Sequence, residues 1–173
     1  MNLKALHKIS YGLYIVASRK KDGNINGQIA NTVFQVTADP PTIAVSINKQ
    51  NLTHEFIKES RVFSVSILKK DTPLKFIGVF GFRTGKEAKK FENVKYKIGV
   101  TGAPIVLENT VGYIEAEVIN SVDVGSHTIF IGRVVDAEVL SGEEPMTYAY
   151  YHEVKQGKTP ERAATYIKEA GKQ

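Results

Sequence analysis

The stretch NGQIANTVFQVTADPPTIAVSINKQNLTHEFI, residues 26–57, contains the pattern that decides the fold. In its middle, large aliphatic side chains alternate with small ones, Ile43, Val45 and Ile47 against Ala44 and Ser46. A period of two places successive side chains on opposite faces of a pleated strand. We therefore expect a strand over residues 42–48 and another over residues 33–37. The next segment, residues 52–60, is predicted to be a short helix whose N-terminus Asn51 or Thr53 can cap.

The same alternation recurs elsewhere in the chain. Segments 11–18 and 62–68 are rich in β-branched and aromatic residues and are predicted to be strands. Further on, apolar residues alternate with acids and then resume after the turn-like segment DVGSH: Ile114, Ala116 and Val118 with Glu115 and Glu117, then Ile129, Ile131, Val135 and Val139. This pattern predicts a long hairpin with one face in water.

The predicted helices are short and peripheral, over residues 3–9, 52–60 and 73–80. A doubly wound sheet needs helices of about ten or more residues between its strands. Six or more strands with such short helical connections instead favour a closed or half-closed barrel.

The composition of the 173 residues indicates one domain whose own side chains carry out no redox chemistry. The chain has no cysteine, which excludes disulfides, thiolate nucleophiles and iron–sulfur ligation, so any redox chemistry requires a borrowed cofactor. The net charge of +5 is dispersed among acidic residues, and we expect no nucleic-acid partner. The lack of a long apolar run and of a secretory signal predicts no membrane association and a cytoplasmic location.

The last residues, EVKQGKTPERAATYIKEAGKQ (153–173), are charged and poor in apolar side chains. A segment of this composition does not supply a core element. We therefore divide the chain into a domain over residues 1–155 and a polar C-terminal arm over residues 156–173. The arm is expected to be a mobile tail or to lie on a neighbouring molecule.

Three polar segments are candidates for ligand binding. The turn from Ser46 to Thr53 ends a strand and begins a helix, where free N–H groups and the helix dipole favour an anion. The cluster Gly27–Thr32 is either an ordinary turn or the lining of a site for a planar ligand. The loop Gly81–Glu87 has the wrong spacing for a Walker motif and Glu87 where Ser or Thr would bind magnesium. Its glycines and basic residues could still hold one phosphate.

The four histidines show no metal-ligand spacing, and we predict no metal site. His127 differs from the others because it follows the turn Gly125–Ser126 and begins a strand. At a barrel rim its side chain could reach a ligand, so a structural role and a functional role both remain open.

Taken together, these segments resemble the flavin reductase-like family of FMN-binding split barrels. The resemblance runs from about residue 6 to residue 166. It rests on the stretch 26–57, on FGFRTGKEAKKF (80–91), on VGSHTIFIGRV (124–134) and on YYHEVKQGKTPERA (150–163). It implies a mostly β fold, a six-stranded Greek-key barrel with short peripheral helices, which forms a homodimer and holds FMN near the subunit interface.

The resemblance also implies which residues bind the cofactor. They are Gln28, Ile29, Ala30, Asn31 and Thr32 at the isoalloxazine and ribityl chain, Ser46, Asn48, Lys49, Asn51 and Thr53 at the ribityl and phosphate, and Phe80, Gly81 and Arg83 on the other side of the flavin. Lys49 and Arg83 would offset the phosphate charge. His127 is the catalytic candidate, although Ser126 stands where many members have Asp.

The activity implied is that of an NAD(P)H:flavin oxidoreductase, in which NADH or NADPH reduces the flavin and electrons pass to free flavin, a ferric complex or a protein. Two alternatives remain open: an FMN-binding electron carrier with little NAD(P)H activity of its own, and a non-enzymatic binding domain. Some relatives carry an appended rubredoxin domain. This chain has no cysteine, so we expect any accepting metal centre to lie on another molecule.

Overall fold

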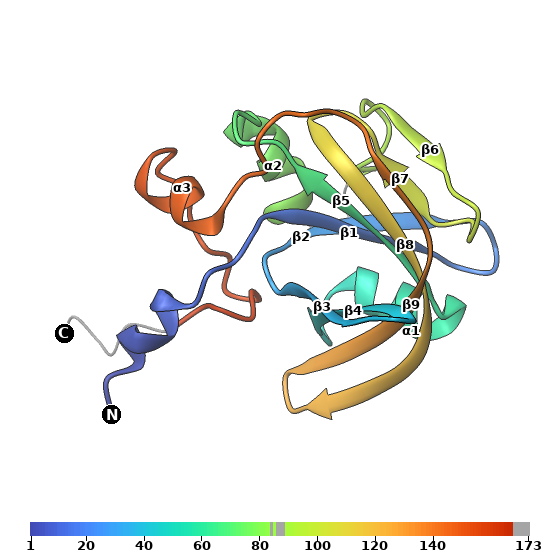
Figure 1. Ribbon diagram of the computed structural model, residues 1–173, viewed down its shortest axis with the longest axis horizontal. Helices are drawn as coiled ribbons and strands as arrows, with labels where there is room; N and C mark the ends of the chain where they lie inside the picture. The colour runs from blue at the N-terminus through green and yellow to red at the C-terminus, as the bar shows by residue number, and fades with distance from the viewer. Residues whose placement is uncertain (84, 86–88, 168–173) are drawn as a thin grey trace.

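The computed structural model describes residues 1–83, 85 and 89–167, which form a curled β-sheet with short helices at its periphery (Figure 1). The strands are β1 (Tyr14–Arg19), β2 (Ile25–Ala30), β3 (Val33–Ala38), β4 (Pro41–Asn48), β5 (Val62–Leu68), β6 (Tyr96–Ile98), β7 (Pro104–Val106), β8 (Thr110–Val124) and β9 (His127–Val139). The helices are the 3-10 helix η1 (Leu3–Lys8) and the α-helices α1 (Leu52–Ser60), α2 (Leu74–Gly81) and α3 (Tyr148–Glu153). None of the described helices is long and apolar enough to cross a membrane.

The main sheet has the strand order β2-β1-β5-β8-β9-β4-β3, and each neighbouring pair is antiparallel. Its two edge strands, β2 and β3, are separated in the sequence by Asn31 and Thr32 alone. Three Cα–Cα steps span at most about 11 Å. The sheet must therefore curl until its opposite edges approach each other, which gives a barrel that is split between β2 and β3.

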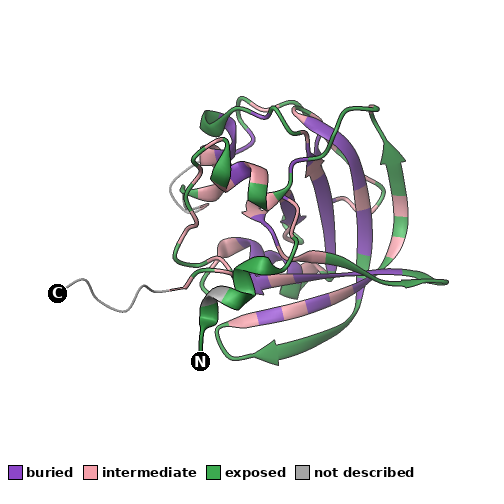
Figure 2. Ribbon diagram, turned by 60° about the vertical axis from the view of Figure 1, so that its left-hand side comes forward, coloured by how far each residue is buried: buried purple, intermediate pink, exposed green. Residues whose placement is uncertain are grey.

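Two hydrophobic clusters lie on the two sides of the curled sheet. Along β1 the side chains alternate between them, because Ile15 and Ala17 belong to the first cluster and Val16 to the second. The first cluster contains Phe80 of α2, and the second, inside the barrel, contains Phe63 of β5. The buried residues follow the barrel strands, whereas the last six residues of β8, 119–124, are exposed (Figure 2).

The mostly β fold with short peripheral helices is confirmed. The expected bounds of β5 and α1 match those observed, and the other expected strands and helices agree within a few residues. Their regular periodicity explains this success.

The main sheet differs in detail from what the sequence indicated. It has seven strands among the described residues, where the resemblance implied a six-stranded barrel. The additional strand, β2, overlaps the cluster Gly27–Thr32, for which a turn and the lining of a ligand site were both considered. The polar residues Asn26 and Gln28 interrupt the apolar alternation by which strands were predicted. A strand that lines a cavity need not be apolar. The two-stranded sheet β6–β7 and the helix α3 were also not expected.

The β6–β7 hairpin covers part of the main sheet and explains a third difference. Glu115 was expected in water, but its side chain is fully buried. Its carboxylate accepts hydrogen bonds from the Val100 and Thr101 backbone N–H groups, both at 3.0 Å, and from the Thr101 hydroxyl at 2.6 Å. A Cβ at Gly99 would lie 2.2 Å from this carboxylate, so a larger residue there would have to displace the carboxylate from its hydrogen bonds.

Replacing Glu115 should therefore destabilise the fold. Glu115→Ala leaves two backbone donors and one hydroxyl without their acceptor, and we expect the free energy of unfolding to fall by about 2–4 kcal/mol. Glu117→Ala is the matched control two residues along β8. Glu117 is exposed, and it forms a solvent-exposed ion pair with Arg133 at 3.6 Å. Its effect should stay within about 0.5 kcal/mol. Urea unfolding of both variants measures the difference, and equal effects would contradict this role for Glu115.

Candidate functional site

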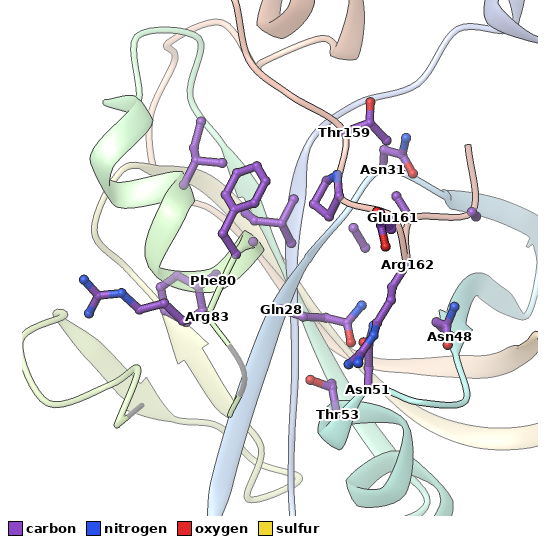
Figure 3. Close-up of a pocket in the computed structure, with 18 of the residues that line it drawn as sticks. Gln28, Asn31, Asn48, Asn51, Thr53, Phe80, Arg83, Thr159, Glu161 and Arg162 are labelled. Carbon is purple, nitrogen blue, oxygen red and sulfur yellow. The ribbon is translucent and has the colours of Figure 1, made fainter. Parts of the chain in front are cut away.

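A cavity of about 630 Å³ lies where β2, the end of β4, the start of α1 and the end of α2 meet (Figure 3). This volume falls within the range of roughly 300–1,000 Å³ that is typical of small-molecule sites. Eleven of the thirteen residues expected to bind a cofactor line it: Gln28, Ile29, Ala30, Asn31, Ser46, Asn48, Asn51, Thr53, Phe80, Gly81 and Arg83. Segments far apart in the sequence are thus brought together around one space.

The β2 wall of the cavity is polar at its centre. Gln28 presents a buried Oε1 atom that has no hydrogen-bond partner among the described residues. An unpaired buried acceptor is costly in a folded protein and suits a ligand that supplies an N–H or O–H donor. The neighbouring Asn26 is already paired, since its Nδ2 donates to the Thr53 hydroxyl at 2.8 Å. Gln28 is therefore the group on this wall that is available to a ligand.

The turn from β4 to α1 forms the lower right part of the cavity in the view of Figure 3. Asn51 occupies the N-cap of α1 but its side chain makes no capping hydrogen bond, and Thr53 does not cap the helix either. The turn is fixed from within, because the Gln50 N–H donates to the Asn48 Oδ1 at 2.9 Å. First-turn amides that lack a side-chain cap favour an anionic or hydrogen-bond-accepting ligand group.

The residues at the end of α2 form the side of the cavity opposite the β4–α1 turn. Phe80 and Gly81 contribute apolar surface, and Arg83 extends from the loop that follows (Figure 3). Thr84, Lys86 and Glu87, which belong to the loop considered above for phosphate binding, lie outside the described residues.

Lys90 was not anticipated as a site residue. Its side chain is buried in the cavity wall, and its Nζ donates to the carbonyl oxygens of Gly27 at 2.9 Å and Phe80 at 3.3 Å. Burial lowers its pKa to about 8. An ammonium group has three donors, so one remains beyond these two bonds. No signal in the sequence separates Lys90 from the neighbouring lysines of this basic loop.

Three expected residues do not line the cavity. Lys49, which follows β4, forms an ion pair with Asp123 of β8. The Thr32 hydroxyl donates to the Asn31 Oδ1 at 3.0 Å. The imidazole of His127 contacts the Ser126 hydroxyl through Nδ1 at 2.8 Å and the Arg162 carbonyl oxygen through Nε2 at 3.3 Å. Burial lowers the pKa of His127, which favours the neutral ring.

The C-terminal arm supplies a part of the lining that was missed. Residues 158–164 all face the cavity, as do Tyr148 and Tyr151 of α3. The arm was expected to be mobile or to lie on another molecule, but residues 156–167 lie on their own chain. The sequence held one signal for this, because the segment GKTPERA belongs to the pattern 150–163 on which the family resemblance rests.

The arrangement can enclose a flat molecule with apolar faces, a polar rim and an anionic end. Among the described residues, no group of three or more His, Cys, Asp or Glu side chains is placed to hold a metal ion. The described residues of the lining supply apolar surface, hydrogen-bonding groups and positive charge.

Comparison with known proteins agrees with this geometry. The chain is 54% identical over 167 residues to a ferric-chelate reductase (NAD(P)H) of Archaeoglobus fulgidus, covering 96% of this chain and 98% of that protein. It is 55% identical over 166 residues to a high molecular weight rubredoxin of Moorella thermoacetica, covering 96% of this chain and 72% of that protein. The structure of an FMN-binding protein from Thermus thermophilus superimposes with a TM-score of 0.71 at 28% identity, covering 79% of this chain and 75% of that one.

The model of one protein family matches most of the chain. The match spans residues 6–158, which include all the strands and helices of the main barrel. This chain belongs to the family of flavin reductase like domains.

Proposed function

We propose that this chain is an NAD(P)H-dependent flavin reductase that holds FMN in the cavity between β2, α1 and α2. The observation that carries the proposal is the buried, unpartnered Gln28 Oε1 in a cavity of about 630 Å³. Membership of the flavin reductase family and 54% identity to a protein named ferric-chelate reductase (NAD(P)H) support the same activity.

The lining fits a flavin in three respects. An isoalloxazine ring carries an N–H group and the ribityl chain carries hydroxyls, and either can donate to Gln28. Ile29, Ala30 and Phe80 provide apolar surface for a planar ring. The turn at Asn51 supplies amide donors for the anionic end.

A bound flavin would supply the chemistry of hydride transfer from the nicotinamide and of electron transfer to an acceptor. The residues of the chain position it and balance its charge. The buried Lys90 ammonium favours added negative charge in the cavity, and the apolar walls reduce the access of water. His127 holds the arm through the Arg162 carbonyl and is a positioning residue in this proposal.

The electron acceptor follows from the relatives. Because the chain spans nearly the whole of a relative named ferric-chelate reductase, we propose a ferric complex as the acceptor. The second candidate is a protein acceptor, as in the FMN-binding electron carrier considered above. It is favoured by the relative named high molecular weight rubredoxin, of which the chain spans 72%.

We also propose that the chain forms a homodimer through β3. This strand is an edge of the main sheet, and it exposes two large apolar side chains, Phe34 at 51% and Val36 at 44%. An exposed edge strand with apolar side chains is prone to pair with another chain unless it is covered. A second copy would cover it and would lie close to Asn31 and the cavity.

The proposed activity is tested by the visible spectrum of the protein as it is purified and then reconstituted with FMN. We expect bound flavin absorption that is bleached when NADH or NADPH is added without air and restored when a ferric chelate is supplied. Flavin bleached by neither nucleotide, yet reduced by a reduced electron-carrier protein, would favour the carrier. Protein that neither takes up FMN nor quenches its fluorescence would contradict the flavin site itself.

Replacing Lys90 should make the bound flavin harder to reduce. In Lys90→Met the cation that favours a negatively charged reduced flavin is lost, and we expect the midpoint potential at pH 7 to fall by about 20–60 mV, where about 30 mV corresponds to 1.4 kcal/mol. Lys89→Met is the matched control, because Lys89 is exposed.

The pH dependence supplies a further check on Lys90. Its pKa of about 8 means that the ammonium is present below that pH and is lost above it. The difference between wild type and Lys90→Met should therefore shrink as the pH rises through this range. An equal shift in Lys89→Met, or a difference that is constant with pH, would contradict the electrostatic role.

The dimer proposal is tested by a charge on the edge strand. Phe34→Asp places a carboxylate where the second copy would pack, and we expect light scattering after gel filtration to report a monomer in place of a dimer. Val100→Asp is the control, since Val100 is 75% exposed on the turn between β6 and β7. A wild-type protein that is monomeric at micromolar concentration would refute the proposal.

A further inference from the structure

The C-terminal arm closes one side of the cavity, and its place there is fixed by side-chain hydroxyls. The arm leaves α3 and turns back so that the Tyr151 hydroxyl donates to the Lys158 carbonyl at 2.9 Å. The Tyr148 hydroxyl then contacts the Thr159 hydroxyl at 2.6 Å and accepts from the Thr165 hydroxyl at 3.3 Å. Two residues of α3 thus hold both ends of the segment that lines the cavity.

The arm is also fastened to the barrel strands. Asn31, between β2 and β3, donates through Nδ2 to the Thr165 hydroxyl at 2.7 Å. His127, at the start of β9, contacts the Arg162 carbonyl at 3.3 Å. The arm therefore leaves α3, reaches the start of β9 at His127, and returns to Asn31 and Tyr148 at Thr165, with residues 158–164 along the cavity.

Arg162 carries a charge from the arm into this space. Its Nη1 lies 3.4 Å from the Gln50 carbonyl oxygen, and in Figure 3 its side chain extends past Gln28 toward Asn51. This long hydrogen bond is the only one that its five guanidinium donors make with described residues. Glu161 also lines the cavity, but its side chain stays beside the arm in the same view (Figure 3).

The other two cations expected at the phosphate do not face the start of α1. Lys49 is engaged with Asp123 outside the cavity, and Arg83 extends from the opposite side (Figure 3). Arg162 is thus the described cation that faces the uncapped start of α1. A guanidinium beside free amide donors matches the shape and charge of a terminal phosphate, which it can contact with two parallel hydrogen bonds.

We infer that the C-terminal arm is a built part of the flavin site and that Arg162 recognises the phosphate of FMN. This inference rests on the proposed function and deepens it. The arm selects FMN over riboflavin, which lacks the phosphate. It also selects against FAD, whose adenylate would have to pass the segment that lies over the cavity. The ordered arm delays the release of the flavin, so FMN acts as a retained cofactor and not as a freely exchanging substrate.

The test is a fluorescence titration of flavin-free protein with FMN, riboflavin and FAD. For Arg162→Ala we expect FMN affinity to fall about 10- to 100-fold, because a charge-assisted contact to the phosphate is lost. Riboflavin affinity should change by less than about threefold, so that the preference for FMN over riboflavin is lost. Arg162→Lys should retain part of the preference, because it keeps the charge and loses the planar fork.

Arg133→Ala is the matched control, since Arg133 is an exposed arginine of β9 outside the cavity lining, and it should leave both affinities unchanged. Thr165→Val removes the tether to Asn31 and should increase the dissociation rates of FMN and riboflavin alike in stopped-flow measurements. Unchanged dissociation in Thr165→Val would overturn the role of the arm as a cover.

Two outcomes for Arg162→Ala overturn phosphate recognition. One is an equal loss of affinity for FMN and riboflavin. The other is an unchanged FMN affinity with a raised KM for NAD(P)H, which would place Arg162 at the dinucleotide. A wild-type protein that binds no flavin would instead refute the proposed function, so the two failures are distinguishable.

Discussion

The short connection from β2 to β3 constrains the barrel and its cavity together. Asn31 and Thr32 must join strands that lie at opposite edges of the main sheet, so the sheet curls and leaves a split where its edges approach. The Ser46 N–H donates to the Thr32 carbonyl at 3.1 Å, which fixes the connection against β4. The cavity lies beside this split, with β2 on one side and the end of β4 on the other. This one connection thereby positions Gln28, Ser46 and Asn31, which holds the arm through Thr165.

The distribution of positive charge shows how tertiary contacts decide which cations can serve a ligand. Lys49 is close in sequence to the anion-binding turn, but its ammonium is paired with Asp123. Lys90 belongs to a basic loop, yet it is buried against two backbone carbonyls. Arg162 is more than 100 residues away from Gln50 in the sequence and contacts its carbonyl oxygen. An ion pair with a nearby acid neutralises a cation, as at Lys49, whereas hydrogen bonds to carbonyl groups leave the charge and the remaining donors of Lys90 and Arg162 available.

The sequence was sufficient for elements whose burial is set by their own periodicity. β5 and α1 were predicted at their observed bounds because each has one regular apolar pattern between clear breaks. Such reasoning fails where a distant segment changes the surroundings. The alternation of residues in β8 predicts that Glu115 faces solvent, but the β6–β7 hairpin covers it. The polar sequence around Gln28 is typical of a turn, but Gln28 lies in a strand whose partner residue is Val16 of β1.

Most of the candidate site was identified from the sequence through the family resemblance, and the part that was missed is held by hydroxyl groups. Polar residues such as Thr159 and Thr165 give no periodic signal, because each makes a single directed bond and buries little apolar area. A hydrogen bond of this kind contributes only about 0.5–1.5 kcal/mol net, since water replaces the partner when the bond opens.

This energetic difference separates the arm from the barrel. The barrel strands bury side chains such as Phe63 and Phe130 completely or nearly so, and opening them exposes apolar area. Lifting the arm instead exchanges a few hydroxyl contacts for contacts with water. Elements with few buried apolar contacts open at a lower free energy than the core. The arm can therefore open to admit a cofactor while the barrel stays folded, and a ligand that adds a bond to Arg162 shifts the arm toward its closed position.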